Sequence, residues 1–205
     1  MRIPLLCLAA ALFAALPAAT EDPEIQTVAK TDFSEKQLSA EWALTSTSWG
    51  IEEGEMRGKG PGVLFCTKSM EGDFKLTMNA WMEQKANVEI QLIDPKTDAA
   101  YFTFVFMGKY HSVLDGVKSA ILKDNNFVSI DPKMWIFPGR MFSFEVRREG
   151  NEFQMFLDHE LGPYFVDDKS PSPMKDFIVR ISILTEGVRD KVRMDDVVLT
   201  APKKK

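Results

Sequence analysis

Six polar and aromatic side chains occupy alternate positions in three short segments between residues 79 and 103. Residues two apart in an extended chain share one face of a sheet. If the three segments are neighbouring strands, they form one concave surface that combines an indole, a phenol, amides and a carboxylate. Aromatic rings cover the C–H face of a pyranose and planar polar groups pair with its hydroxyls, so this combination predicts carbohydrate binding. The six residues are Asn79, Trp81, Glu89, Gln91, Tyr101 and Thr103.

Two further residues follow the third segment directly. We expect Lys109 and His111 to reach the same surface from its rim. The alternative is that His111 is an ordinary loop residue and that Trp81 and Tyr101 are packed beneath the segment 108–138. The only other histidine is His159, and the two have no spacing typical of zinc ligands.

Two adjacent aspartates near the C-terminus are the remaining candidates for metal binding. Asp195 and Asp196 lie in an expected last strand, where neighbouring side chains point to opposite faces. A hard cation such as calcium needs several oxygen ligands, and two carboxylates supply only part of such a site. The pair therefore has two interpretations, a structural calcium site or a solvated turn or hydrogen-bonded aspartate, and no other cofactor is expected.

The elements that must position these residues are strands. Six segments alternate between apolar and more polar side chains with a period of two, and turn residues separate them. No sustained helical pattern follows residue 21, and 34–42 offers two helical turns at most. About twelve strands in this length predict an all-β fold, an antiparallel two-sheet sandwich. The predicted core contains Phe74, Leu76, Val88, Ile90, Phe102, Phe104, Phe144, Val146, Met155, Ile181 and Ile183.

The first twenty residues resemble a signal peptide. Arg2 precedes the apolar run 4–16, and small residues follow it before Glu21. The run is too short to span a bilayer, and no later stretch is apolar enough to do so. We therefore divide the chain into a signal peptide (1–20), a lead-in (21–31), one sandwich domain (32–200) and a basic tail (201–205). The protein is expected to be exported to the periplasm or the exterior.

Charge and cysteine content exclude other classes. The 205 residues include 25 basic and 30 acidic side chains, a net charge of −5. Domains that bind nucleic acid usually present a basic face, so no nucleic-acid partner is expected. Removal of the leader would remove Cys7 and leave Cys66 as a single cysteine, which excludes an internal disulfide. Cys66 lies in an expected strand and is interpreted as a buried, inert thiol.

Five segments follow one another in a recognisable order. They are a tryptophan hairpin at 49–58, a glycine-aspartate strand start at 72–76, the segments 144–148 and 156–158, and an acidic closing strand at 192–199. This order resembles the concanavalin-A-like jelly roll over residues 32–200. Within that superfamily it is similar to the secreted 3-keto-disaccharide hydrolase domains, also called family-16-glycoside-hydrolase-like. The resemblance implies a carbohydrate context, with members that are sugar-active or only sugar-binding.

The resemblance also tests for catalysis. In the laminarinase-type branch of this fold, one strand carries Glu, Asp and Glu at alternate positions. The nearest segment here has Glu89, then the uncharged Gln91, then Ile93. Retaining glycoside hydrolysis needs two carboxylates about 5–5.5 Å apart, so one carboxylate on this strand cannot perform it alone. A different arrangement stays open, because Glu145 and Asp158 also point to polar faces, although each is also explained as a surface charge. Such an enzyme would be a hydrolase or lyase that cleaves glycosidic bonds, and no catalytic residue is assigned.

Two function classes stay open at this point. The first is an exported jelly roll that binds or processes carbohydrate. The second is a non-catalytic adhesion or assembly domain that binds a protein partner. The first predicts a polar groove with an exposed aromatic residue, whereas the second predicts a flatter apolar patch of several hundred Å².

Overall fold

The computed structural model describes residues 24–35, 37–84, 86–108, 119–168, 174, 176–185 and 187–203. Within these ranges the chain forms strands joined by turns, and no helix is present. The strands are β1 (Ile25–Thr31), β2 (Trp42–Leu44), β3 (Trp49–Glu52), β4 (Glu55–Lys59), β5 (Gly62–Cys66), β6 (Phe74–Met82), β7 (Ala86–Ile93), β8 (Ala100–Phe106), β9 (Ser119–Lys123), β10 (Asn126–Asp131), β11 (Met141–Glu149), β12 (Glu152–Leu157), β13 (Glu160–Val166), β14 (Ile178–Thr185) and β15 (Lys191–Pro202).

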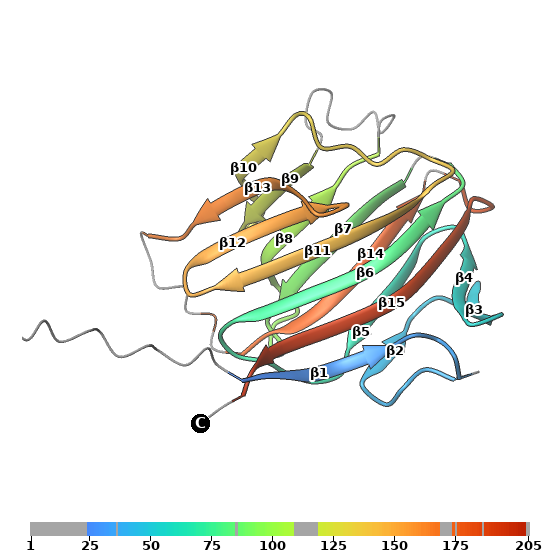
Figure 1. Ribbon diagram of the computed structural model, residues 1–205, viewed down its shortest axis with the longest axis horizontal. Helices are drawn as coiled ribbons and strands as arrows, with labels where there is room; N and C mark the ends of the chain where they lie inside the picture. Colours follow the sequence, from blue (N-terminus) through green and yellow to red (C-terminus); the bar gives the residue numbers. More distant parts are fainter. Residues whose placement is uncertain are drawn as a thin grey trace, which may run out of the picture.

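The strands form two antiparallel sheets packed face to face (Figure 1). Sheet A has eight strands in the order β13-β12-β11-β6-β15-β4-β3, and β1 also pairs with β15. Sheet B has seven strands in the order β10-β9-β8-β7-β14-β5-β2. The predicted all-β two-sheet sandwich is therefore confirmed. The segment 21–31, assigned above as a lead-in, contains β1, which pairs with β15 in sheet A.

The core lies between the sheets and follows the predicted alternation. All eleven predicted core residues are buried, with side chains at most 3% exposed. Rings from the two sheets meet directly: the centroids of Phe102 in β8 and Phe153 in β12 are 4.0 Å apart. Phe106 in β8 meets Phe144 in β11 edge to face, with centroids 5.0 Å apart. The period of two therefore identifies the inward face of these strands correctly.

The turns follow the residues that favour them. Glu53 and Gly54 both have positive φ and join β3 to β4, as predicted for that hairpin. Asp124 and Asn125 do the same between β9 and β10. Of the expected cover 108–138, the described part 119–131 forms these two strands and extends sheet B. The helical turns considered for 34–42 do not form among the described residues there, because Trp42 begins β2.

The tryptophan hairpin packs through glycine. Trp49 is buried, and its indole covers Gly58 and Gly62, where a Cβ atom would collide with the ring. The indole N–H donates to the carbonyl of Gly60 at 3.2 Å. Close approach of backbone and ring therefore requires glycine at these two positions. Cys66 in β5 is fully buried, and burial raises the pKa of its thiol, as expected for an inert cysteine.

No helix in the described part of the chain is long and apolar enough to cross a membrane. The predicted signal peptide lies outside the described residues.

Candidate functional site

The six residues of the predicted surface are divided between the two sheets. Asn79 and Trp81 lie on β6 in sheet A, whereas Glu89, Gln91, Tyr101 and Thr103 lie on β7 and β8 in sheet B. Because the apolar partners of each set point into the core, the two sets face away from each other on opposite outer faces. The prediction of one surface formed by three neighbouring strands is wrong, because the chain changes sheet between β6 and β7.

The outer face of sheet B carries a row of polar side chains across three adjacent strands. Arg180 on β14 is paired in register with Gln91 on β7, and Gln91 with Thr103 on β8. The Nε of Arg180 donates to Oε1 of Gln91 at 2.8 Å. The Nε2 of Gln91 donates in turn to Oγ1 of Thr103 at 3.4 Å. We call these three residues the polar row.

A second rank of outward-facing residues lies beside the polar row. Glu89 on β7 is paired with Ser182 on β14 and with Val105 on β8. Glu89 is half-buried and Ser182 is buried. Asn87 follows on the same face of β7, and its side-chain oxygen accepts a hydrogen bond from the backbone N–H of Gly108 at 3.1 Å. Glu89 is the only carboxylate at the outward positions of β14, β7 and β8.

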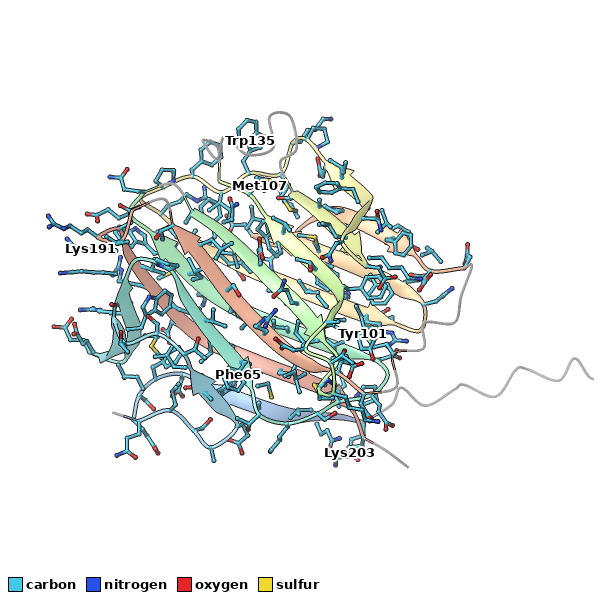
Figure 2. All side chains as sticks on the ribbon, turned by 180° about the vertical axis from the view of Figure 1, so that it is seen from behind. Phe65, Tyr101, Met107, Trp135, Lys191 and Lys203 are labelled. Carbon is cyan, nitrogen blue, oxygen red and sulfur yellow. The ribbon has the colours of Figure 1, made fainter. Side chains whose placement is uncertain are left out.

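Two aromatic residues flank the polar row on opposite sides. Arg180 is paired with Gln91 on one neighbouring strand and with Phe65 on the other, β5. Tyr101 on β8 lies toward the opposite edge of the sheet, and β14 and β7 run between the two rings (Figure 2). Burial raises the pKa of Tyr101, and a hydrogen bond to Asp94 raises it further. The phenol is therefore a neutral hydrogen-bonding group at neutral pH.

The turn between β7 and β8 also contacts the polar row. Asp98 has a positive φ, and its carboxylate lies 3.4 Å from Nη1 of Arg180. The Arg180 side chain is 29% exposed, whereas that of Asp98 is 79% exposed. The guanidinium is thus held on one side by an amide and on the other by a carboxylate. The arrangement offers fixed donors and acceptors to a neutral polar ligand.

The two residues on sheet A have different surroundings. The guanidinium of Arg193 on β15 lies over the indole of Trp81, 4.6 Å from its centroid. Trp81 also lines a hollow of about 690 Å³ together with Arg57 and Lys191. The Nδ2 of Asn79 donates to Oδ2 of Asp196 at 3.2 Å. One face of Trp81 is therefore covered by an arginine.

The sequence led us to expect that Asp195 and Asp196 point to opposite faces of the sheet, and this expectation is wrong. The register between β15 and β6 shifts between Asp195 and Val198, and Asp196 has a positive φ. Asp195 is paired with Asn79, and Asp196 bonds to the side chain of the same Asn79. The bulge therefore turns both carboxylates toward the outer face of sheet A.

The aspartate pair is the place where a cation would be sought. Burial raises the pKa of Asp195, and the charges of Asp196 and Glu55 raise it further. Like charges held together are a feature of calcium sites, but such sites need more oxygens. Among the described residues no three His, Cys, Asp or Glu side chains are grouped as a metal site.

Two predicted site residues, Lys109 and His111, lie outside the described residues. Sequence reasoning missed Arg180 and Phe65. The alternation of 179–183 did place Arg180 on an outward face. What the sequence did not reveal is that β14 lies beside β7, because 84 residues separate the two strands.

Comparison with known proteins supports the fold. No protein-family model and no curated protein sequence matches the chain. A Bacillus subtilis protein of unknown function with a galectin-like fold is 9% identical, with a TM-score of 0.67 over 86% of this chain and 97% of that chain. The metal-free lectin I-B4 of Griffonia simplicifolia is 10% identical, with a TM-score of 0.63 over 87% and 99%.

A carbohydrate-binding module from Bacillus subtilis is 13% identical, with a TM-score of 0.55 over 78% of this chain and 96% of that chain. At these identities the likeness shows the fold alone. The chain has a lectin-like jelly-roll fold, in agreement with the concanavalin-A-like resemblance. The narrower resemblance to 3-keto-disaccharide hydrolase domains stays a prediction.

Proposed function

We propose that this chain is an exported carbohydrate-binding domain and that the sugar lies on the outer face of sheet B, over β14, β7 and β8. The observation that carries the proposal is the polar row, in which Arg180, Gln91 and Thr103 are linked by hydrogen bonds across three strands. Glu89 completes the set with a carboxylate from the adjoining rank.

The chemistry of the row suits a neutral sugar. Each sugar hydroxyl can both donate and accept, and the row presents a guanidinium and an amide, with a carboxylate beside them. Thr103 is buried, 7% exposed, and its hydroxyl holds the amide from below. Neighbouring strands hold these groups about 4.8 Å apart. Because they are already fixed by bonds to one another, little side-chain entropy is lost when a ligand binds. Phe65, half-buried beside Arg180, supplies an aromatic surface at the edge of the row.

Binding is favoured over retaining hydrolysis by the carboxylate count. That mechanism uses two carboxyl groups about 5–5.5 Å apart. Glu89 has no second carboxylate beside it at the outward positions of β14, β7 and β8. The similar structures support the ligand class, since one is named as a carbohydrate-binding module and another as a lectin.

A glycan array probed with the mature protein and two variants tests the proposal. Gln91→Leu keeps the bulk of the side chain but removes its donor and acceptor, so captured glycans should be lost. Asn79→Leu makes the matched amide-to-leucine change on the outer face of sheet A and should retain them. An array without captured glycans would contradict the function. Loss of capture in Asn79→Leu but not in Gln91→Leu would move the site to sheet A.

A specific observation favours the second function, binding of a protein partner. Phe127 and Ile130 on the edge strand β10 are 43% and 47% exposed, and Phe127 is paired with Leu122 on β9. Exposed apolar side chains grouped on one face are typical of protein interfaces. An empty glycan array together with self-association that Phe127→Asp abolishes would favour this function.

Export is proposed from the apolar run at 4–16 and the single charge before it. Mass spectrometry of the protein recovered from its natural source should find an N-terminus near residues 19–21. An intact Met1 on most of that protein would contradict export by a cleaved signal peptide.

A further inference from the structure

A cleft lies at the end of the sandwich where the chain crosses from sheet B to sheet A. It has a volume of about 420 Å³, within the range of about 300–1,000 Å³ that is usual for small-molecule sites. The segment 131–140, which joins β10 to β11, forms one wall. The turn between β12 and β13 and the start of β13 form the other, with Asp158, Glu160 and Leu161. We call this the end cleft.

The first wall presents two aromatic rings. Trp135 and Phe137 are two residues apart, and their rings are nearly parallel, with an interplanar angle of 14° and centroids 6.5 Å apart. The residue between them holds the segment in place, because the N–H of Ile136 donates to the carbonyl of Met107 at 3.1 Å. Figure 2 shows Trp135 beside Met107 at the upper end of the molecule. Phe137 is 44% exposed, so part of its ring is open to solvent.

Polar groups from the two walls are held together in a fixed arrangement, with Arg140 in the first wall and Asp158 in the second. Arg140 is ion-paired with Asp158, and its guanidinium lies 4.2 Å from the ring centroid of Phe142. The other oxygen of Asp158 accepts the backbone N–H of Ser143 at 2.9 Å. Asp158 also has a positive φ, in the two-residue turn that joins β12 to β13. Backbone and side-chain contacts therefore fix the carboxylate and the guanidinium before any ligand arrives.

The charges in the end cleft nearly cancel. Its lining holds three acidic groups (Asp131, Asp158 and Glu160) and two basic groups (Lys133 and Arg140). Because Arg140 and Asp158 neutralise each other, an anion would find no free guanidinium, and the remaining charges of Asp131, Glu160 and Lys133 sum to only one negative charge. A neutral ligand with one flat apolar face and many hydroxyls uses both walls.

We propose that the end cleft is a second carbohydrate site, separate from the outer face of sheet B. A pyranose ring would lie with its C–H face on Phe137 or Trp135, and its hydroxyls would bond to Asp158, Arg140 and Glu160. The ligand class rests on the function proposed above, but none of the residues is shared. Two sites on one domain would let a longer glycan bind more tightly than either site alone.

Nuclear magnetic resonance of the 15N-labelled full chain tests this site. The probes are the neutral disaccharides cellobiose, maltose, lactose and chitobiose, together with any glycan that the array captures. A saturable shift of the Trp135 indole N–H is expected with at least one probe, assigned through its absence in Trp135→Phe. Phe137→Ala should weaken that binding about tenfold or more, as for loss of an anchoring aromatic residue. Asp158→Asn should weaken it as well.

The control is Phe127→Ala, which removes a ring of nearly equal exposure (43%) from the outer face of sheet B. It should leave the Trp135 shift unchanged. Shifts confined to residues of β7, β8 and β14 would overturn the end cleft and leave the function intact. Unchanged affinity in Phe137→Ala would also overturn it. No shift anywhere, together with an empty array, would overturn both proposals.

Discussion

Arg180 and Gln91 face each other directly across β14 and β7, with Nε of the arginine 2.8 Å from Oε1 of the glutamine. The bond fixes which end of the amide points to which neighbour. Since Oε1 accepts from Arg180, Nε2 is directed at Thr103, to which it donates at 3.4 Å. Side chains from β14 and β8, which are far apart in sequence, thus hold one amide in a single orientation. A sugar hydroxyl can form hydrogen bonds to an amide fixed in this way.

This relationship predicts the effect of Arg180→Lys. Lysine keeps the charge but has no planar fork, so it cannot hold Gln91 and Asp98 in the same geometry. We expect affinity for a captured glycan to fall about tenfold. The free energy of unfolding should fall by no more than about 1 kcal/mol, the net value of one hydrogen bond. Titration calorimetry and a thermal melt measure the two effects.

Arg193→Lys is the matched control for that change. Arg193 also lies beside an aromatic ring, that of Trp81, but on the outer face of sheet A. It should leave glycan affinity unchanged. If both lysine variants bind as the wild type does, the polar row does not contact the sugar.

The core predicts a second result. Phe104 is fully buried between the sheets, and its ring lies 6.3 Å from that of Phe153. Phe104→Ala should lower the free energy of unfolding by roughly 3–5 kcal/mol, because it leaves a cavity. Phe127→Ala removes an exposed ring and should cost less than about 1 kcal/mol. Urea denaturation of both variants measures the difference, and equal costs would be incompatible with the inward face assigned to β8.

Local alternation predicts the faces of strands but not their neighbours. Phe104 and Thr103 are correctly assigned to opposite faces because side chains alternate strictly along a strand. Trp81 is wrongly grouped with Gln91 because their segments are consecutive, whereas β6 and β7 belong to different sheets. Pairing between distant strands depends on contacts across the whole core, and no pattern within one strand encodes it. For the same reason, the sequence does not predict that Arg180 lies beside Gln91.

A bulge causes a different error at Asp195 and Asp196. Alternation assigns adjacent residues to opposite faces only while the register is regular. The shift after Asp195 inserts one extra residue into β15, and the left-handed φ of Asp196 turns its side chain back. Neither the two aspartates nor their apolar neighbours form a sequence pattern that predicts this register shift.

Acid stability should depend on Glu145. Although burial opposes ionisation, hydrogen bonds from Lys75 and Arg147 lower the pKa of Glu145 in the folded protein. A lowered pKa means that the stabilising contribution is present above the unfolded pKa and is lost as pH falls through the folded pKa. Glu145→Gln should therefore lower stability at pH 7 by roughly 1–2 kcal/mol. The difference from the wild type should shrink in thermal melts at progressively lower pH. A constant difference would mean that ionisation of Glu145 plays no part.

Ionisation of Asp195 should lower the stability of the fold, whereas ionisation of Glu145 raises it. Burial and the charges of Asp196 and Glu55 raise its pKa, so the folded state resists its ionisation. The stability associated with the protonated form is complete below the unfolded pKa and is lost as pH rises through the folded pKa. Asp195→Asn keeps an oxygen that can accept the N–H of Asp196, now at 2.8 Å, and removes the charge. The variant should melt at a higher temperature than the wild type at pH 7, and the gain should vanish at a pH below the unfolded pKa.

The same melts with added calcium provide the check. If calcium raises the Tm of the wild type and Asp195→Asn abolishes that rise, the pair is a cation site and the repulsion has a binding function. If the variant is instead less stable than the wild type at pH 7 without calcium, the charge of Asp195 stabilises the bulge, and the expected sign of the effect is wrong.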